Sequence, residues 1–206
     1  MSRFIQPLEP RTLFTAVPAT TLISDELQIV RQAITTRAAL SASVPLVNAD
    51  NKILKADLKG LSNKAQNQAL GKTLKKDESI ALATLRADET LLLNPSLADA
   101  RHAFVAGIQV LVHPTSAKLQ AKLAVFLSAL NTVTTTPLAN LNTAANAVKT
   151  TLATDLSAIA SADPSAALDA AKEDGDINTA VGNFVTAAQS FATDVGTLAT
   201  DLATLP

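Results

Sequence analysis

Apolar residues recur every three or four positions along most of the chain, with polar residues between them. This spacing places the apolar side chains on one face of an α-helix and so predicts a series of amphipathic helices. The clearest run, near the C-terminus, consists of Ile177, Val181, Phe184, Ala188, Phe191, Val195, Leu198 and Leu202. A second clear run consists of Leu119, Leu123, Phe126, Leu127, Leu130 and Val133. We expect both faces to pack into a helical core.

The first helix is predicted to begin at Ser24. Serine can cap a helix, and the acidic Asp25 and Glu26 favour the positive end of the helix dipole. The apolar face of this helix is predicted to consist of Leu27, Val30, Ile34 and Ala38. Its end is predicted at a short polar stretch that contains Ser41, Ser43 and Pro45.

Prolines with polar neighbours divide the rest of the chain. Breaks are predicted at Asn94-Pro95, His113-Pro114, Thr134–Pro137 and Asp163-Pro164, and a turn is predicted at Glu173–Asp176. A polar residue followed by Pro is typical of a helix start, because Pro fits the first helical position. Together these signals predict six or seven helices. Because short connections make neighbouring helices antiparallel, we expect an all-α, up-and-down helical bundle that could be elongated.

The composition agrees with this fold class. Ala, Leu and Thr make up nearly half of the chain, whereas aromatic residues are 3% and there are six Gly. Ala and Leu favour helices, and so few aromatic residues disfavour a β-sandwich or barrel. Three prolines within residues 1–23 predict an irregular N-terminal arm, and residues 24–206 are predicted to form a single helical domain.

One six-residue element occurs twice. The sequence Thr-Leu-Ala-Thr-Asp-Leu stands at residues 151–156 and again at residues 197–202. Degenerate copies begin at Leu54 and Leu85. The element is either an internal repeat or a recurring way to place Leu inward with Asp and Thr outward, and the sequence leaves both interpretations open.

The charge balance limits the possible partners. The formal net charge is -1, which argues against nucleic acid, because phosphate contacts require an excess of positive charge. Residues 52–76 are nevertheless rich in Lys, and Lys52, Lys55 and Lys59 share one side of a continuous helix. They form a candidate basic patch for an anionic surface partner, such as a polysaccharide or a lipid headgroup. Alternatively, they form a solvated face or pair loosely with the acidic residues of the C-terminal region.

Few residues are suited to chemistry. The chain has no Cys, which excludes disulfides, thiolate metal sites and a Cys nucleophile. Its two histidines, His102 and His113, have no neighbouring carboxylate in a recognisable motif, and no zinc ligand set is visible. The acidic cluster at residues 173–176 does not match a calcium-binding loop. We therefore assign no catalytic, cofactor-binding or metal-binding residue and expect the protein not to be an enzyme.

The N-terminal region carries the most specific string in the chain. Its key residues are Leu8, Glu9, Pro10, Arg11, Leu13 and Phe14. This string resembles the LEPR-XLL motif, a short N-terminal signature shared by otherwise unrelated bacterial exported proteins. Phe14 stands where the family often has Leu. The resemblance covers residues 4–16 and implies recognition by export or sorting machinery. No conventional signal peptide is expected in residues 1–24, and no apolar stretch is long enough to span a membrane.

These observations favour a non-enzymatic, exported or cell-surface helical protein with a structural or interaction role. Helices of this kind can also self-associate through their apolar faces, so a homo-oligomer is compatible with the pattern. A lipid or apolar-ligand binding module is the alternative, with residues 119–133 and 177–202 as its best candidate faces. A cytoplasmic location is the alternative to export.

Overall fold

The computed structural model describes residues 17–57 and 64–205, and the side chains of residues 45–51, 57 and 64 lie outside this description. The described residues form five α-helices and one 3-10 turn, with no strand. These elements are α1 (Ala19–Asp57), α2 (Lys64–Val112), α3 (Ala117–Val133), α4 (Thr135–Ala162), η1 (Pro164–Ala166) and α5 (Ala167–Ala203).

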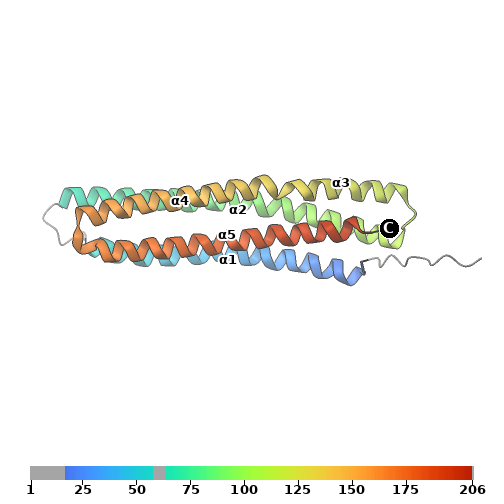
Figure 1. The fold of residues 1–206 in the computed structure, drawn as a ribbon, viewed down its shortest axis with the longest axis horizontal. Coiled ribbons are helices and arrows are strands. Elements are labelled where there is room, and N and C mark those ends of the chain that lie inside the picture. Colours follow the sequence, from blue (N-terminus) through green and yellow to red (C-terminus); the bar gives the residue numbers. More distant parts are fainter. Residues whose placement is uncertain (1–16, 58–63, 206) are drawn as a thin grey trace, which may run out of the picture.

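The helices form an elongated bundle of four rods, as Figure 1 shows. α3 and α4 together make one rod, because only Thr134 separates them. Successive rods run in opposite directions, so the start of α1 and the end of α5 lie at the same end of the bundle. α1 packs mainly against α5 and also against α2, and α4 packs against both α2 and α5. The prediction of an all-α, up-and-down bundle is confirmed.

The helices are fewer than the predicted six or seven because three predicted breaks lie inside helices. The first concerns α1, which begins at Ala19 rather than Ser24 and continues past residues 41–45 to Asp57. At its start, Leu22 is fully buried and ties the first turn to the core. Further along, the Ser43 hydroxyl donates a hydrogen bond to the Leu40 carbonyl oxygen at 2.6 Å. Ser43 is therefore satisfied within the helix and does not end it.

The second break was predicted at Asn94-Pro95, but α2 continues through Pro95. Proline removes one backbone donor and usually kinks or ends a helix. Here Leu92 and Leu93 before it and Ala100 after it are all buried. The core contacts on both sides of Pro95 outweigh the lost hydrogen bond, so the tertiary structure overrides the local signal.

The third wrong prediction is the turn at Glu173–Asp176, which lies within α5. Glu173 and Ile177 are both buried, so the helix is held in the core on each side of Gly175. A Cβ built on Gly175 meets no atom within 4 Å, so this glycine serves no close contact. Buried positions at helical spacing decide the local structure here, and the acidic, glycine-containing composition does not.

The other predicted breaks agree with the structure. α2 ends at Val112, just before His113-Pro114, and α3 ends just before Thr134. The chain does not reverse at Thr134, however, so the antiparallel arrangement expected there is wrong. At Asp163-Pro164 the Asp163 carboxylate accepts a hydrogen bond from the Ser165 backbone N–H at 2.9 Å. This cap and the proline together start η1 and turn the chain into α5.

The core is built around α5. All eight residues of its predicted apolar face are buried, and Phe184 and Phe191 are among the largest fully buried side chains. Many of the facing positions are alanines, among them Ala33, Ala103 and Ala145. Small side chains let the helix axes approach closely.

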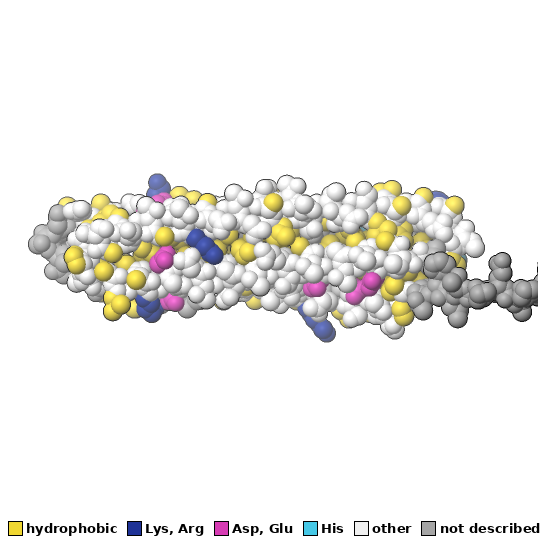
Figure 2. All heavy atoms as spheres, viewed as in Figure 1, with side chains coloured by type: hydrophobic (Ala, Val, Ile, Leu, Met, Phe, Trp, Pro, Cys, Tyr) yellow, Lys and Arg dark blue, Asp and Glu magenta, His cyan; other side chains and the backbone are white. Residues whose placement is uncertain are grey.

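The surface carries many threonines and few charges. A Thr hydroxyl on one turn commonly donates to the carbonyl oxygen four residues earlier, as Thr154 does to Thr150 at 2.8 Å and Thr197 does to Thr193 at 3.1 Å. These hydroxyls are satisfied within their own helix. Figure 2 shows one face of the bundle, on which few charged side chains are visible and apolar side chains lie along the seam between α4 and α5.

Candidate interaction surface

α1 carries two apolar stripes at helical spacing. The first is buried in the core and consists of Leu22, Ile29, Ala33 and Leu40. The second is exposed and consists of Ile23, Leu27, Val30 and Ile34, whose exposed fractions are 46%, 51%, 43% and 60%. Leu27, Val30 and Ile34, together with the exposed Ala38, are the apolar face that the sequence predicts for this helix. That face does not enter the core, because the other stripe of α1, which contains Ile29, is the one that faces the core.

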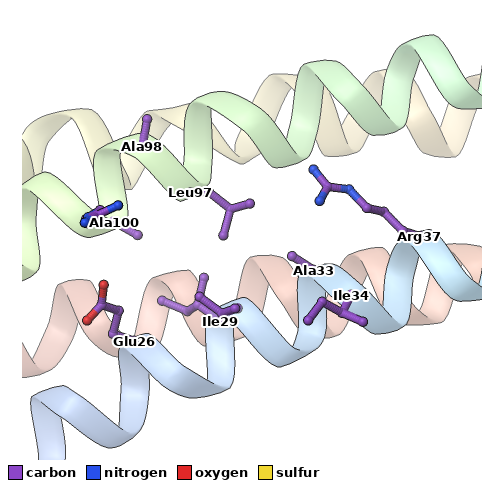
Figure 3. A pocket seen from close by; sticks show the side chains of 10 residues that line it. Glu26, Ile29, Ala33, Ile34, Arg37, Leu97, Ala98 and Ala100 are labelled. Carbon is purple, nitrogen blue, oxygen red and sulfur yellow. The ribbon is translucent and has the colours of Figure 1, made fainter.

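A groove lies beside the exposed stripe, between α1 and α2. Its volume is ≈ 350 Å³, and its apolar lining comes from both helices, as Figure 3 shows. Val30 and Ile34 of the exposed stripe form part of one wall, and Leu97 and Ala98 form part of the other. The exposed stripe and the groove are therefore continuous. We call them together the α1–α2 surface.

α2 has exposed apolar positions of its own. Leu91, Ala98 and Val105 are spaced by seven residues, so they lie on the same side of α2, and all three are exposed. The exposed fraction is 59% for Leu91 and 45% for Val105. A contiguous group of large exposed apolar side chains on a monomer usually marks an interaction site.

Charged residues lie at the two ends of the groove. Glu26 is at one end and Arg37 is at the other, both on α1 (Figure 3). Arg37 donates to the Asn94 side-chain oxygen of α2 at 3.0 Å, which closes that end. Arg101 of α2 also lines the groove. The groove therefore has an apolar floor with polar ends, a common arrangement for a protein interface.

The predicted basic patch is described only in part. Lys52 and Lys55 are exposed on α1, and Lys59 lies outside the described residues. The acidic residues of the C-terminal region were the alternative partners for these lysines. One of them, Asp176, forms an ion pair with Lys172 of its own helix α5, at 2.8 Å. The anionic surface partner stays a prediction.

Carboxyl groups meet at two helix interfaces, a feature that the sequence pattern does not predict. Asp25 of α1 faces Asp201 of α5, with Asp194 of α5 nearby. Burial, the hydrogen bond with Asp201 and the charges of Asp201 and Asp194 raise the pKa of Asp25 to about 6. Asp194 itself contacts Gln28 of α1, and burial raises the pKa of Asp194.

The second carboxyl contact joins α4 to α2. Burial and the neighbouring Asp77 raise the pKa of Asp155. Asp155 and Asp201 occupy the same position in the two copies of the repeated six-residue element. Its Leu residues are buried in both copies, as the sequence predicts. The Asp residues do not simply point outward, because each faces a carboxyl group of another helix.

The two histidines lie apart and are exposed. The His102 ring stacks on the Phe126 ring, with centroids 5.5 Å apart and planes at 29°. The ammonium group of Lys122 lies 5.8 Å from the same Phe126 ring. His113 follows the end of α2. The structure therefore shows an aromatic contact between α2 and α3 at His102, and it does not bring the two imidazoles together.

Within residues 17–57 and 64–205, no group of three or more His, Cys, Asp or Glu side chains could hold a metal ion. In the same part of the chain, no helix combines the length and apolar character required to cross a membrane. The sorting-like residues Leu8, Glu9, Pro10, Arg11, Leu13 and Phe14 lie outside the described residues, so their role stays a prediction.

Comparison with family models, curated proteins and solved structures finds no significant match to this chain.

Proposed function

We propose that this protein is a non-enzymatic helical interaction protein, exported or displayed at the cell surface. The observation that carries the interaction role is the exposed apolar stripe of α1, which continues into the α1–α2 groove. Four large aliphatic side chains along one helix are roughly half exposed, although the same helix has a complete core face. Exposure of such a group to water is unfavourable, and a partner that covers it removes this cost.

The proposed location rests on the N-terminal string. Its resemblance to the LEPR-XLL motif supports recognition by export or sorting machinery.

Cell fractionation of the native host tests the location, together with mass spectrometry of the protein's N-terminus. We expect the chain in the envelope or the medium, trimmed within or just after residues 8–16. Leu13→Asp should retain the protein in the cytosol, whereas the matched change Thr12→Ser should not. A cytosolic protein with residues 1–23 intact would contradict export and leave an intracellular interaction module.

A second candidate function is binding of a lipid or another apolar ligand. The groove of ≈ 350 Å³ favours it, because this volume lies within the range of small-molecule sites. The faces predicted for this role, residues 119–133 and 177–202, contribute to the core, so their use would require the bundle to open. Flotation with vesicles that contain anionic lipid tests this candidate, and failure of the protein to float with the vesicles would remove it.

A further inference from the structure

On α1 and α2, the charged residues are sorted by exposure. Every described Lys and Arg of these two helices is exposed, whereas every described Asp and Glu is half-buried or buried. On the opposite face, formed by α4 and α5, few charged side chains are visible (Figure 2). The formal net charge of -1 therefore does not describe the outer side of α1 and α2, where the outermost charges are positive.

A group of these cations gathers at one end of the bundle, where the end of α1 and the start of α2 lie together (Figure 1). Arg37 of α1 contacts Asn94 of α2, and the two helices are antiparallel. Counting equal numbers of residues from this contact brings Lys55 of α1 to the level of Lys76 of α2, to within about one turn. The group, which we call the lysine cluster, consists of Lys52, Lys55, Lys72, Lys75 and Lys76.

The lysines of α2 avoid the side of this helix that faces α4. α2 packs against both α1 and α4. Asp77 faces Asp155 of α4, and Leu74 is buried in the core. Each residue of a helix is rotated by about 100° from the one before, so Lys75 lies on the opposite flank of Leu74 from Asp77. This arrangement turns the carboxyl group of Asp77 away from the lysine cluster.

The lysine cluster lies in line with the exposed stripe of α1. Buried residues of α1 recur at intervals of seven, as Leu22 and Ile29 do, so residues separated by multiples of seven share a side. Lys55 follows Ile34 by three such intervals and Leu27 by four. The basic section and the apolar section of α1 therefore lie on one side of the rod, over roughly 42 Å from Leu27 to Lys55 at 1.5 Å per residue.

These two sections together indicate the chemistry of the partner. Among the described residues, no lysine of the cluster takes part in an ion pair, so the positive charges are available to an anionic partner. A bilayer with anionic lipid is flat over this length, and it offers negative headgroups to the lysines and an apolar layer to the aliphatic side chains. A free polyanion, such as a polysaccharide, would contact the lysines and leave the stripe in water.

We propose that the lysine cluster and the exposed stripe of α1 bind together to the surface of a bilayer that contains anionic lipid. The ammonium groups contact the headgroups, and the aliphatic side chains of the stripe enter the boundary between headgroups and acyl chains. This inference rests on the proposed interaction role of the α1–α2 surface and names its partner. It differs from the second candidate function because the bundle stays closed and the groove needs no ligand.

Flotation of the full chain with vesicles tests the proposal. We expect the protein to float with phosphatidylcholine vesicles that contain about 30% phosphatidylserine and to bind at least tenfold more weakly to phosphatidylcholine alone. Binding should weaken when the salt concentration is raised from about 0.05 M to about 0.5 M, because the headgroup contacts are screened.

Paired lysine variants test the place of binding. Lys72→Gln combined with Lys76→Gln should weaken binding to the anionic vesicles roughly 30-fold. The matched control, Lys118→Gln combined with Lys122→Gln, has the same spacing and the same change of charge. It lies on α3 at the opposite end of the bundle and should change binding by less than about twofold. Equal losses in the two pairs would overturn the proposal. Circular dichroism checks that each variant keeps its helices.

An apolar variant separates a bilayer from a free polyanion. Ile34→Ser should weaken vesicle binding roughly tenfold and leave binding to soluble dextran sulfate unchanged. The control is Val125→Ser on α3, at a residue that is 69% exposed, and it should change neither. Binding to dextran sulfate with no effect of Ile34→Ser on vesicles would identify a free polyanion and overturn the proposal. Absence of flotation at low salt would also overturn it. The proposed interaction role would then stand, because a protein can cover the α1–α2 surface without lipid.

Discussion

α5 and α1 lie side by side in the bundle but use their apolar residues differently. All eight residues of the apolar face predicted for α5 are buried, whereas all four predicted for α1 are exposed. α5 has one clear apolar stripe, so the choice of core face is unambiguous. α1 has two, and only one of them can face α5 and α2, the helices on which α1 packs. Periodicity therefore identifies apolar stripes, and it does not identify which stripe is buried.

The largest expected loss in the free energy of unfolding comes from a substitution in α5. Phe184→Ala removes a fully buried ring and leaves a cavity between helices, so we expect a loss of about 4 kcal/mol in the free energy of unfolding. Urea denaturation followed by circular dichroism measures it. A loss below about 1 kcal/mol would mean that α5 is not the centre of the core.

The same comparison can be made within α1 with one residue type. Ile29 is 1% exposed and Ile34 is 60% exposed. Ile29→Ala should reduce the free energy of unfolding by about 3 kcal/mol. Ile34→Ala should change it by less than about 0.5 kcal/mol when measured at a concentration where the chain is monomeric. Equal effects of the two changes on urea denaturation would show that the assignment of the two stripes is wrong.

Two glycines distinguish a close helix contact from an open one. A Cβ on Gly107 of α2 would collide with Leu202 of α5 and approach Leu205 to 3.3 Å, whereas a Cβ on Gly175 meets nothing within 4 Å. Gly107→Ala should therefore destabilise the bundle by about 2 kcal/mol. Gly175→Ala should stabilise it by roughly 0.5 to 1 kcal/mol through helix propensity. Thermal unfolding of both variants checks the two signs, and a stabilising Gly107→Ala would contradict the packing of α2 on α5.

The smallest expected effect on stability comes from the contact of Asp25 on α1 with Asp201 on α5. The pKa of Asp25 is raised to about 6 from 3.8, so the folded state binds a proton more tightly than the unfolded state. This contribution to stability is fully present below pH 3.8 and is lost as the pH rises through about 6. The melting temperature should therefore fall between pH 5 and pH 7.

Asp25→Asn removes one of the two facing carboxylates. It should flatten the pH dependence of the melting temperature and stabilise the bundle at neutral pH by about 0.5 kcal/mol, the size expected for removal of a like-charge contact near the surface. A melting temperature of the natural protein that rises steadily from pH 5 to pH 7 would contradict this account of Asp25.

The prediction of the candidate surface was partial, for a physical reason. The sequence identified Leu27, Val30 and Ile34 as one apolar face but could not show that it is exposed, because the competing stripe at Ile29 has the same spacing. The groove depends on how α2 lies against α1, and that arrangement is absent from the local pattern. The contact between Asp25 and Asp201 is also absent from the local pattern, because these residues lie far apart in the chain.

The sequence by itself determined the helical class and the buried face of α5. These properties follow from local propensity and a single apolar stripe. The tertiary structure decided the length of each helix, the stripe of α1 that is buried and the carboxyl groups that meet. Core contacts on both sides of Pro95 and Gly175 kept helices continuous where the local signals predicted breaks. Contacts between distant segments outweigh local preferences of about 1 to 3 kcal/mol, and a local pattern cannot contain them.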